Sequence, residues 1–196
     1  MKLHQSSARL GTVLLFLSLA LGLTACSLPN ATVTKGAAAV SKPLSNGEIL
    51  QVLQTLNSGE LKQAELVFKR PTLAEVQKTA QLIIKDHTAS NQRIAAITKD
   101  AGIKLEESPL SRGLQAQLNQ ITESMTKLSD TEFECTYLKK QVEQHALALD
   151  TVRKQLLPAA ENPQVKQLLT TAAPALEAHR QAAQKSYDSI SECPRG

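Results

Sequence analysis

Three histidines lie where apolar residues would be expected. His87 (in the stretch LIIKDHTAS), His145 and His179 each fall near the middle of a stripe of apolar residues at helical spacing. A carboxylate, Glu60, falls in a gap on the apolar stripe of another segment. Imidazole nitrogens and carboxylate oxygens are ligands that bind zinc, iron and copper in proteins. These residue types therefore predict a metal-binding or small-ligand-binding site inside a helical core.

Two other interpretations of the histidines stay open. A neutral histidine in a core needs a hydrogen-bond partner for each ring nitrogen, and Thr, Gln, Glu60 or another histidine could supply it in a purely structural cluster. The histidines could also form a pH switch, because burial lowers their pKa and acid would then load the core with charge. A ferritin-type di-iron centre is not expected, because it needs Glu-x-x-His on two helices. The residues three before the histidines are Ile84, Val142 and Leu176.

Helical spacing of apolar residues continues through the chain after residue 45, and no segment alternates with the period of a strand. Start signals and prolines predict four long helices, over about 45–69, 72–102, 130–157 and 162–190. The starts are marked by capping boxes at Ser45/Glu48 and Thr72/Glu75, by SDTE around Asp130, and by Asn162 before Pro163.

These helices predict an all-α fold, an antiparallel four-helix bundle formed by residues 45–196. The connection between the second and third helices is long, and it contains apolar residues that predict a short extra helix: Leu110, Leu114, Leu118, Ile121, Met125 and Leu128. If this connection crosses the length of the bundle, the fold is ferritin-like. A plain up-down-up-down bundle is the rival topology.

The ferritin-like topology predicts the levels of the candidate ligands. His87 and His145 each lie about 22 Å from the starts of their helices, and those starts share one end of the bundle. By the same count, His179 and Glu60 are each about 7 Å away from that level. Pro174, one turn before His179, removes a backbone hydrogen bond and predicts a kink in the last helix, or else a break in it at 171–173.

Two cysteines are predicted to form a disulfide. Cys135 lies near the start of the third long helix, and Cys193 follows the end of the fourth. Antiparallel helices bring these two ends together, and an exported protein meets an oxidising environment. No C-x-x-C redox motif is present.

The N-terminal residues have the features of an export signal. A short basic head and an apolar run predict a signal peptide over residues 1–25. The run ends in LTAC, which is similar to the lipobox of bacterial lipoproteins, and Cys26 is then the lipidated residue. Residues 26–44 contain this cysteine and a small, polar stretch that predicts a flexible tether. Ser27 in place of Asp favours the outer membrane, with the protein facing the periplasm on its lipid anchor.

Composition excludes several classes of function. Without Lys2 and Arg9 the chain carries 20 basic and 18 acidic residues, and it has no Trp, two Tyr and three Phe. This weak charge and the scarcity of aromatic rings argue against a nucleic-acid partner. No glycine-rich phosphate loop, GxSxG or HExxH motif is present, so no particular reaction is predicted.

The sequence also resembles a known bacterial family. GEILQVLQTLNSGELKQAELVFKR, VQKTAQLIIKDHTASNQRI, EFECTYLKKQVEQHALAL and NPQVKQLLTTAAPALEAHRQAA are similar to the family of domain of unknown function 4142, over about residues 45–187. Its most specific pieces here are Asp86-His87, Glu143-x-His145 and Pro174-x-x-x-x-His179. The resemblance implies a ferritin-like fold and an exported, often membrane-anchored protein, with no established reaction.

Taken together, these features predict a membrane-anchored periplasmic helical lipoprotein with a structural or interaction role and a protein partner in the envelope. The alternative is a metal- or small-ligand-binding bundle that uses His87, His145 and His179, with Glu60 as a further ligand. A redox enzyme would also need an open coordination position on the metal, which the sequence does not reveal.

Overall fold

The computed structural model describes residues 42–194, and all of its regular structure in this range is helical. The signal peptide, Cys26 and most of the predicted tether lie outside the described residues. The elements are α1 (Asn46–Val67), α2 (Ala74–Asp100), α3 (Pro109–Thr126), α4 (Asp130–Thr151), the π-helix η1 (Val152–Leu156), α5 (Leu157–Ala159) and α6 (Pro163–Ser189).

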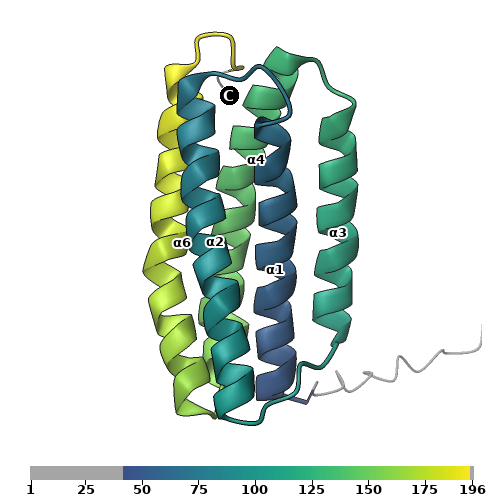
Figure 1. Ribbon diagram of the computed structural model, residues 1–196, viewed down its shortest axis with the longest axis vertical. Helices are drawn as coiled ribbons and strands as arrows, with labels where there is room; N and C mark the ends of the chain where they lie inside the picture. The colour runs from purple at the N-terminus through teal and green to yellow at the C-terminus, as the bar shows by residue number, and fades with distance from the viewer. Residues whose placement is uncertain (1–41, 195–196) are drawn as a thin grey trace, which may run out of the picture. The chain divides into compact units, whose positions relative to one another are not determined.

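The long helices have the ferritin-like topology. α1 and α2 are antiparallel, α3 carries the chain back along the length of the bundle, and α4 and α6 form the second antiparallel pair (Figure 1). As a result, α2 and α4 start at the same end. The side chain of Arg70, before α2, donates to the backbone oxygen of Leu128, before α4, at 2.7 Å. The prediction of a crossing connection is confirmed, and the up-down-up-down alternative is wrong.

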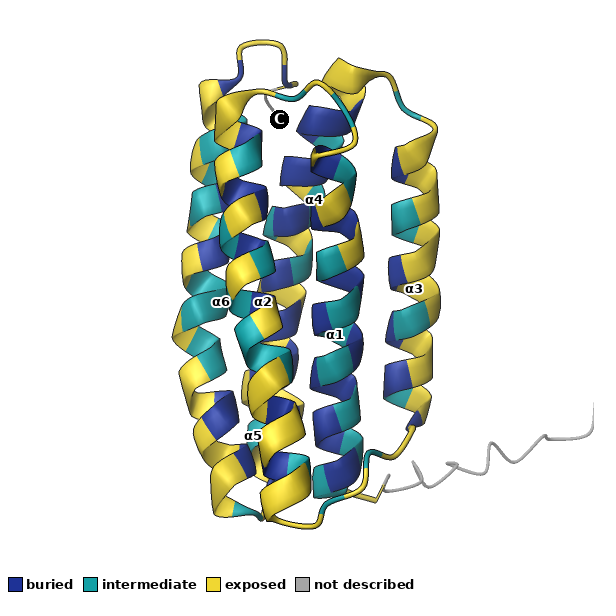
Figure 2. Ribbon diagram, in the orientation of Figure 1, coloured by how far each residue is buried: buried dark blue, intermediate teal, exposed yellow. Residues whose placement is uncertain are grey.

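The short extra helix predicted in this connection is α3, which packs against the outer side of α1 (Figures 1 and 2). Gly59 of α1 permits the close approach, because a Cβ atom at this position would lie 2.7 Å from Leu118 Cδ1. The four helices α1, α2, α4 and α6 therefore enclose the core, and α3 lies outside them.

The apolar core is divided into two clusters, one toward each end of the bundle. The first contains Leu50, Ile94 and Leu169, and the second contains Val67, Ile83 and Leu138. Between the two clusters, each of the four core helices contributes buried polar side chains: Asn57, Glu60 and Gln63 of α1, His87 of α2, Gln141 and His145 of α4, and His179 of α6. We refer to these seven residues as the polar layer. Since the described residues 42–194 belong to one compact unit that contains both clusters, this unit is expected to fold on its own.

Three of the four predicted helix starts are confirmed. Ser45 and Glu48 form a capping box, Ser129 and Glu132 cap α4, and the side chain of Asn162 accepts hydrogen bonds at the start of α6. The predicted capping box of Thr72 and Glu75 is wrong, because α2 starts without a side-chain cap.

At the start of α2, the N-cap residue is Leu73, and its backbone N–H donates to the carboxylate of Glu134 on α4. The hydroxyl of Thr72 donates instead to the backbone oxygen of Val67. A tertiary contact from another helix thus replaces the local cap.

Pro158 and Pro174 do not end the helices in which they lie. The third long helix was predicted to end before Pro158, but α4 continues through η1 into α5, which ends at Ala159. Pro158 has no backbone N–H to donate, and the π-helical turn η1 lies directly before it, so the helical path continues with one hydrogen bond missing. α6 continues without a break through Pro174, so the predicted alternative of two separate helices is wrong.

The predicted disulfide between Cys135 and Cys193 is confirmed, with a Cα–Cα distance of 5.3 Å. It joins α4 to the segment after α6 and closes a loop with a sequence separation of 58 residues. In the chain-entropy model such a loop stabilises the fold by about 4 kcal/mol. The bond therefore holds together the helix pair that carries His145 and His179. Among the described residues, no helix combines the length and apolar character required to cross a membrane.

Candidate metal centre

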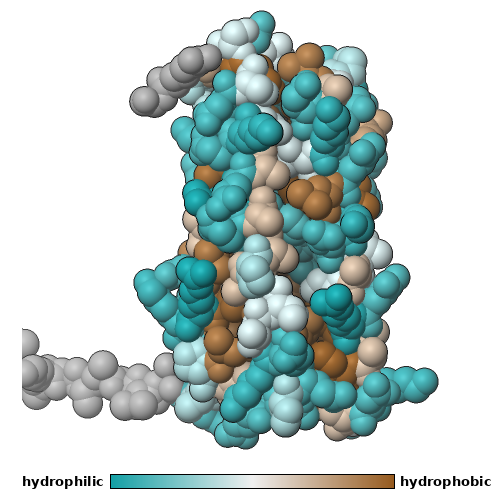
Figure 3. Space-filling model, turned by 90° about the vertical axis from the view of Figure 1, so that its left-hand side faces the viewer, coloured by the Kyte–Doolittle hydropathy of each residue, from teal (hydrophilic) through white to brown (hydrophobic). Residues whose placement is uncertain are grey.

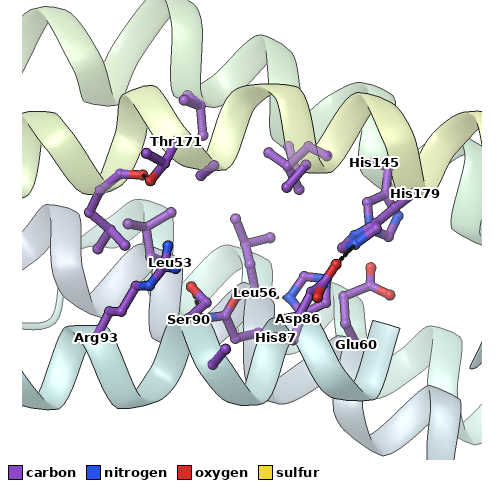
Figure 4. A pocket seen from close by; sticks show the side chains of 18 residues that line it. Leu53, Leu56, Glu60, Asp86, His87, Ser90, Arg93, His145, Thr171 and His179 are labelled. Carbon is purple, nitrogen blue, oxygen red and sulfur yellow. Dashed lines mark hydrogen bonds and ion pairs between the residues drawn. The ribbon is translucent and has the colours of Figure 1, made fainter. Parts of the chain in front are cut away.

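Three helices bring the three histidines together inside the bundle. His87 comes from α2, His145 from α4 and His179 from α6, and all three side chains are buried. The ring centroids are 5.1 to 5.7 Å apart. One ring nitrogen from each residue lies within 4.8 Å of the corresponding nitrogens of the other two. Figure 4 shows the side chains of the site at one end of a pocket.

The predicted level of His179 is wrong, because the structure places its ring against that of His145. Part of the offset of about 7 Å followed from ending the third helix before Pro158, because two further residues add about 3 Å. The helical path that contains His145 continues to Ala159, so His145 lies farther from that end of the bundle than the sequence indicated. This brings it closer to the level of His179, which α6 carries up from the same end.

Hydrogen bonds fix which nitrogen of His87 is protonated. Its Nδ1 lies 2.8 Å from Asn57 Oδ1. The amide of Asn57 is oriented by its Nδ2, which donates to Ser90 Oγ and Asn91 Oδ1 at 2.9 and 2.8 Å, so Oδ1 faces His87. His87 Nδ1 therefore donates a proton to Asn57 Oδ1. Its Nε2 carries the lone pair, is buried and has no hydrogen-bond partner among the described residues.

The same reasoning applies to His145. Its Nδ1 lies 2.9 Å from the backbone oxygen of Gln141, which can only accept a hydrogen bond. Nδ1 therefore carries the proton. When the ring is neutral, the lone pair is on Nε2, and this nitrogen lies 3.2 Å from His179 Nδ1.

His179 lies between two acceptors. Its Nε2 is 2.9 Å from Asp86 Oδ2, and its Nδ1 faces the lone pair of His145. With Asp86 ionised, Nε2 donates to the carboxylate. The Nδ1 position then needs either a second proton, which would make His179 a cation, or a positive ion shared with His145. Burial lowers the pKa of His179, although the hydrogen bond with Asp86 opposes that effect, so the ring's second proton is disfavoured.

These hydrogen bonds leave three nitrogens for a cation: His87 Nε2, His145 Nε2 and His179 Nδ1. The opposite nitrogen of each ring is held by Asn57, by the Gln141 backbone or by Asp86. Metal-binding histidines have the same arrangement, in which the second nitrogen donates to a carboxylate or carbonyl oxygen.

The spacing of the rings also suits an ion. Two nitrogens that share a tetrahedral zinc ion are about 3.3 Å apart, and the His145–His179 pair is at 3.2 Å. The full group spans 4.8 Å, so at least one ring must move slightly inward to close on an ion.

Burial keeps the histidines ready to bind a metal near neutral pH. Desolvation lowers the pKa of His87 well below its usual value, and the neighbouring rings of His145 and His179 lower it further. Desolvation also lowers the pKa of His145 to about 4, opposed by its bond to Gln141. These two rings are therefore neutral at neutral pH, which leaves their lone pairs free.

Glu60 is buried beside the histidines but is not one of the residues in the compact three-histidine group. Desolvation raises its pKa to about 7, and Gln141 and His179 oppose the shift. Its Oε2 has no hydrogen-bond partner among the described residues, nor does the nearby hydroxyl of Tyr137. A carboxylate with a raised pKa and a free oxygen can exchange a proton when positive charge arrives.

Sequence reasoning missed the residues that orient the rings. Asp86 is adjacent to His87 in the sequence, so it points to a different side of α2, where it reaches across to His179 on α6. Asn57 was not considered, although a polar residue four positions after Leu53 on an apolar stripe was a usable signal. The expected contact between two histidines is present, and it is a hydrogen bond only when His179 carries a proton on Nδ1.

The site opens into a pocket of about 240 Å³ between α2 and α6. Glu60 and the three histidines are at one end, and Arg93 and Thr171 are at the other (Figure 4). The π-helix η1 contributes Val152 to its wall. Such π-helical turns within α-helices are frequent at functional sites.

The chain matches the family model described as a domain of unknown function, DUF4142, over residues 30–185. It belongs to the DUF4142 family. No curated protein and no solved structure matches the chain. The three histidines, Asp86, Asn57 and Glu60 all fall within the residues matched by the DUF4142 model. The match identifies the family and assigns no reaction to this site.

The buried Glu60 predicts a pH-dependent difference between the metal-free protein and its Glu60→Gln variant. In the folded protein the pKa of Glu60 is about 7, above the ordinary 4.5, so between these values the folded state holds a proton that the unfolded state has released. The stability contributed by this proton is lost as the pH rises through 7. From pH 5 to pH 8, the wild type should lose roughly 3 kcal/mol relative to the variant.

Urea unfolding in the presence of a chelator measures this difference. Glu65→Gln, on an exposed position of α1, is the matched control and should show no such trend. Parallel stability curves for wild type and Glu60→Gln would mean that Glu60 is ionised in the folded protein at neutral pH.

Proposed function

We propose that this DUF4142 protein binds a transition-metal ion through His87, His145 and His179, and that it does so as a lipoprotein of the outer membrane, facing the periplasm. The observation that carries the proposal is the direction of the lone pairs. One nitrogen of every ring lies beside an acceptor, so the other nitrogen is left for an ion, and the three rings bring one nitrogen each within 4.8 Å of the others. Without a cation or a proton between them, His145 Nε2 and His179 Nδ1 lie 3.2 Å apart and both carry lone pairs, which repel each other.

The ligand set favours an ion of borderline softness. Three neutral imidazoles suit zinc, copper or iron, and they do not suit magnesium or calcium, which prefer oxygen ligands. A site with three protein ligands keeps further positions for a small molecule or for Glu60. The ligand pattern differs from a carboxylate-rich di-iron centre, so ferritin-type iron oxidation is not part of the proposal.

An envelope interaction module without a metal is supported less well. The large exposed hydrophobic side chains of the described residues are Phe68, Leu73 and Leu147. Phe68 and Leu73 flank the loop between α1 and α2, whereas Leu147 lies on α4, so they indicate no single broad apolar face. Binding a partner through the outer helix faces would not require the polar layer. A bundle with a well-packed apolar core in its place would be at least as stable.

The location rests on the N-terminal sequence. The run ending in LTAC at residues 23–26 has the pattern of a lipoprotein signal, and acyl chains on Cys26 would hold the folded unit at a membrane surface. The tether, extending to residue 44, would allow this unit to stand away from the lipid.

The metal proposal predicts about one ion per chain in residues 27–196, isolated without a chelator or a histidine tag. These residues contain only the three histidines of the site, so any imidazole-bound ion reports on it. The triple His→Gln variant should lose the ion. Asp86→Asn should keep its fold and weaken binding roughly 10- to 100-fold, because it removes the group that orients His179.

Elemental analysis and zinc titration measure both effects, and Asp100→Asn, at an exposed position of the same helix, is the control. Equal metal content in the wild type and the triple variant would refute the site. Absence of metal in both, with the triple variant less stable, would show that the histidines are structural.

The anchor is tested separately by Cys26→Ser in the full-length chain. Wild-type protein should partition with detergent and sediment with outer membranes, whereas the variant should remain in the aqueous phase. The variant should still bind metal, because the site lies within the folded unit. A variant that stays in the membrane fraction would contradict lipid anchoring at Cys26.

A further inference from the structure

The pocket that leads to the histidines has unused hydrogen-bonding capacity at its outer end. Arg93 is exposed and forms no ion pair or hydrogen bond with any described residue. The hydroxyl of Ser90 accepts from Asn57 at 2.9 Å, and its own proton has no acceptor among the described residues. Ser90 and Arg93 lie three positions apart on α2, so they are neighbours on one face of the helix. Together they offer a cation and a hydroxyl donor to an anion.

The body of the pocket is apolar. Between its two polar ends the wall is formed by leucine and alanine side chains, among them Leu53, Leu56, Leu176 and Ala172. On the α6 side of the molecule, hydrophobic side chains are visible in the lower half beside a pale band of residues of intermediate hydropathy (Figure 3). The volume of the pocket, about 240 Å³, is near the lower limit for small-molecule sites.

The two polar ends are separated along the helix axis. Arg93 follows His87 by six residues, which corresponds to about 9 Å along α2. Figure 4 shows Arg93 and Thr171 at one end, Leu56 in the middle, and His179 with Glu60 at the other. A ligand that fills this space has an anionic head, a short apolar body and an end that approaches the histidines.

We propose that the pocket binds a small amphipathic carboxylate, with its carboxylate group on Arg93 and Ser90 and its apolar body directed toward the three-histidine site. Arg93 supplies the geometry that carboxylates prefer, with parallel N–H groups able to donate to both oxygens. Because the inner end of the ligand would lie next to the ion, the role of the pocket in this protein rests on the proposed metal site. Binding through Arg93 does not itself require the ion.

Other anions fit the pocket less well. Inorganic phosphate or sulfate would use Arg93 but leave the leucine-lined body without contacts. A long-chain fatty acid is longer than the roughly 9 Å that separate the two polar ends. A short alkyl chain can bury its methylene groups against the leucines, at about 0.8 kcal/mol for each one.

The test uses hexanoate as the probe and calorimetric titration as the measurement, on residues 27–196, with and without zinc. We expect hexanoate to bind, acetate to bind at least tenfold more weakly, and decanoate to bind no more tightly than hexanoate, because its chain is longer than the roughly 9 Å between the two polar ends. Arg93→Gln should weaken hexanoate binding at least tenfold, as expected for loss of a charge-assisted hydrogen bond. Arg112→Gln, on the exposed face of α3, is the matched control.

A second variant separates the pocket from mere surface attraction. Ala172→Leu narrows the wall without touching a histidine, and it should abolish hexanoate binding while zinc affinity stays unchanged. Hexanoate binding that survives both Arg93→Gln and Ala172→Leu would overturn the proposal. Binding that requires zinc but not Arg93 would also overturn it, because the carboxylate would then sit on the ion.

The outcomes for the metal and for the pocket can be told apart. Hexanoate binding that depends on Arg93 in a protein without affinity for zinc would remove the metal function and leave the carboxylate pocket. Zinc binding without any hexanoate binding would remove the carboxylate pocket and leave the metal function.

Discussion

The polar layer is the constraint on which the rest of this structure depends. A buried polar group without a partner costs about 1–3 kcal/mol of folding stability. This bundle places the seven polar side chains of the polar layer between two apolar clusters. Most of them are satisfied by contacts between helices, such as Asn57 with His87 and His179 with Asp86. The exceptions include His87 Nε2 and Glu60 Oε2, which lie on the same side of the layer as the pocket. The layer is incomplete at the place where a ligand could complete it.

The electrostatics of the layer follow from the same burial. Desolvation lowers the pKa of the histidines and raises that of Glu60, so the layer tends toward a neutral state at neutral pH. A bound divalent ion would reverse this balance for Glu60, since positive charge nearby favours the carboxylate. Glu60 could therefore release its proton when an ion enters, without being a ligand itself. The disulfide and the continuous α6 hold the helices that set this geometry.

Much of the fold follows from local sequence signals. The caps at Ser45 and Asn162, the apolar stripes and the positions of Cys135 and Cys193 predicted the helices, their order and the disulfide. The cluster of histidines also followed, because each lies mid-stripe on its own helix. In contrast, the start of α2 depends on Glu134 of a different helix, which no local pattern reveals.

The finer design of the site depends on how the helices are rotated and shifted against one another. The contact of Asp86 with His179 crosses from α2 to α6, and the role of Asn57 depends on Ser90 and Asn91 fixing its amide. Part of the error in the predicted level of His179 arises because the helical path after His145 continues past Pro158. Each of these contacts joins residues far apart in the sequence, so spacing along one helix could not predict them.

The central claim is that three specific imidazole nitrogens share one ion. Nuclear magnetic resonance of the protein labelled only at histidine nitrogens tests it most directly, because residues 27–196 contain only three histidines. In a zinc titration, the account predicts that His87 Nε2, His145 Nε2 and His179 Nδ1 shift together and saturate at one equivalent. The opposite nitrogens should remain protonated. Three rings that keep their metal-free signals at saturating zinc would contradict the account.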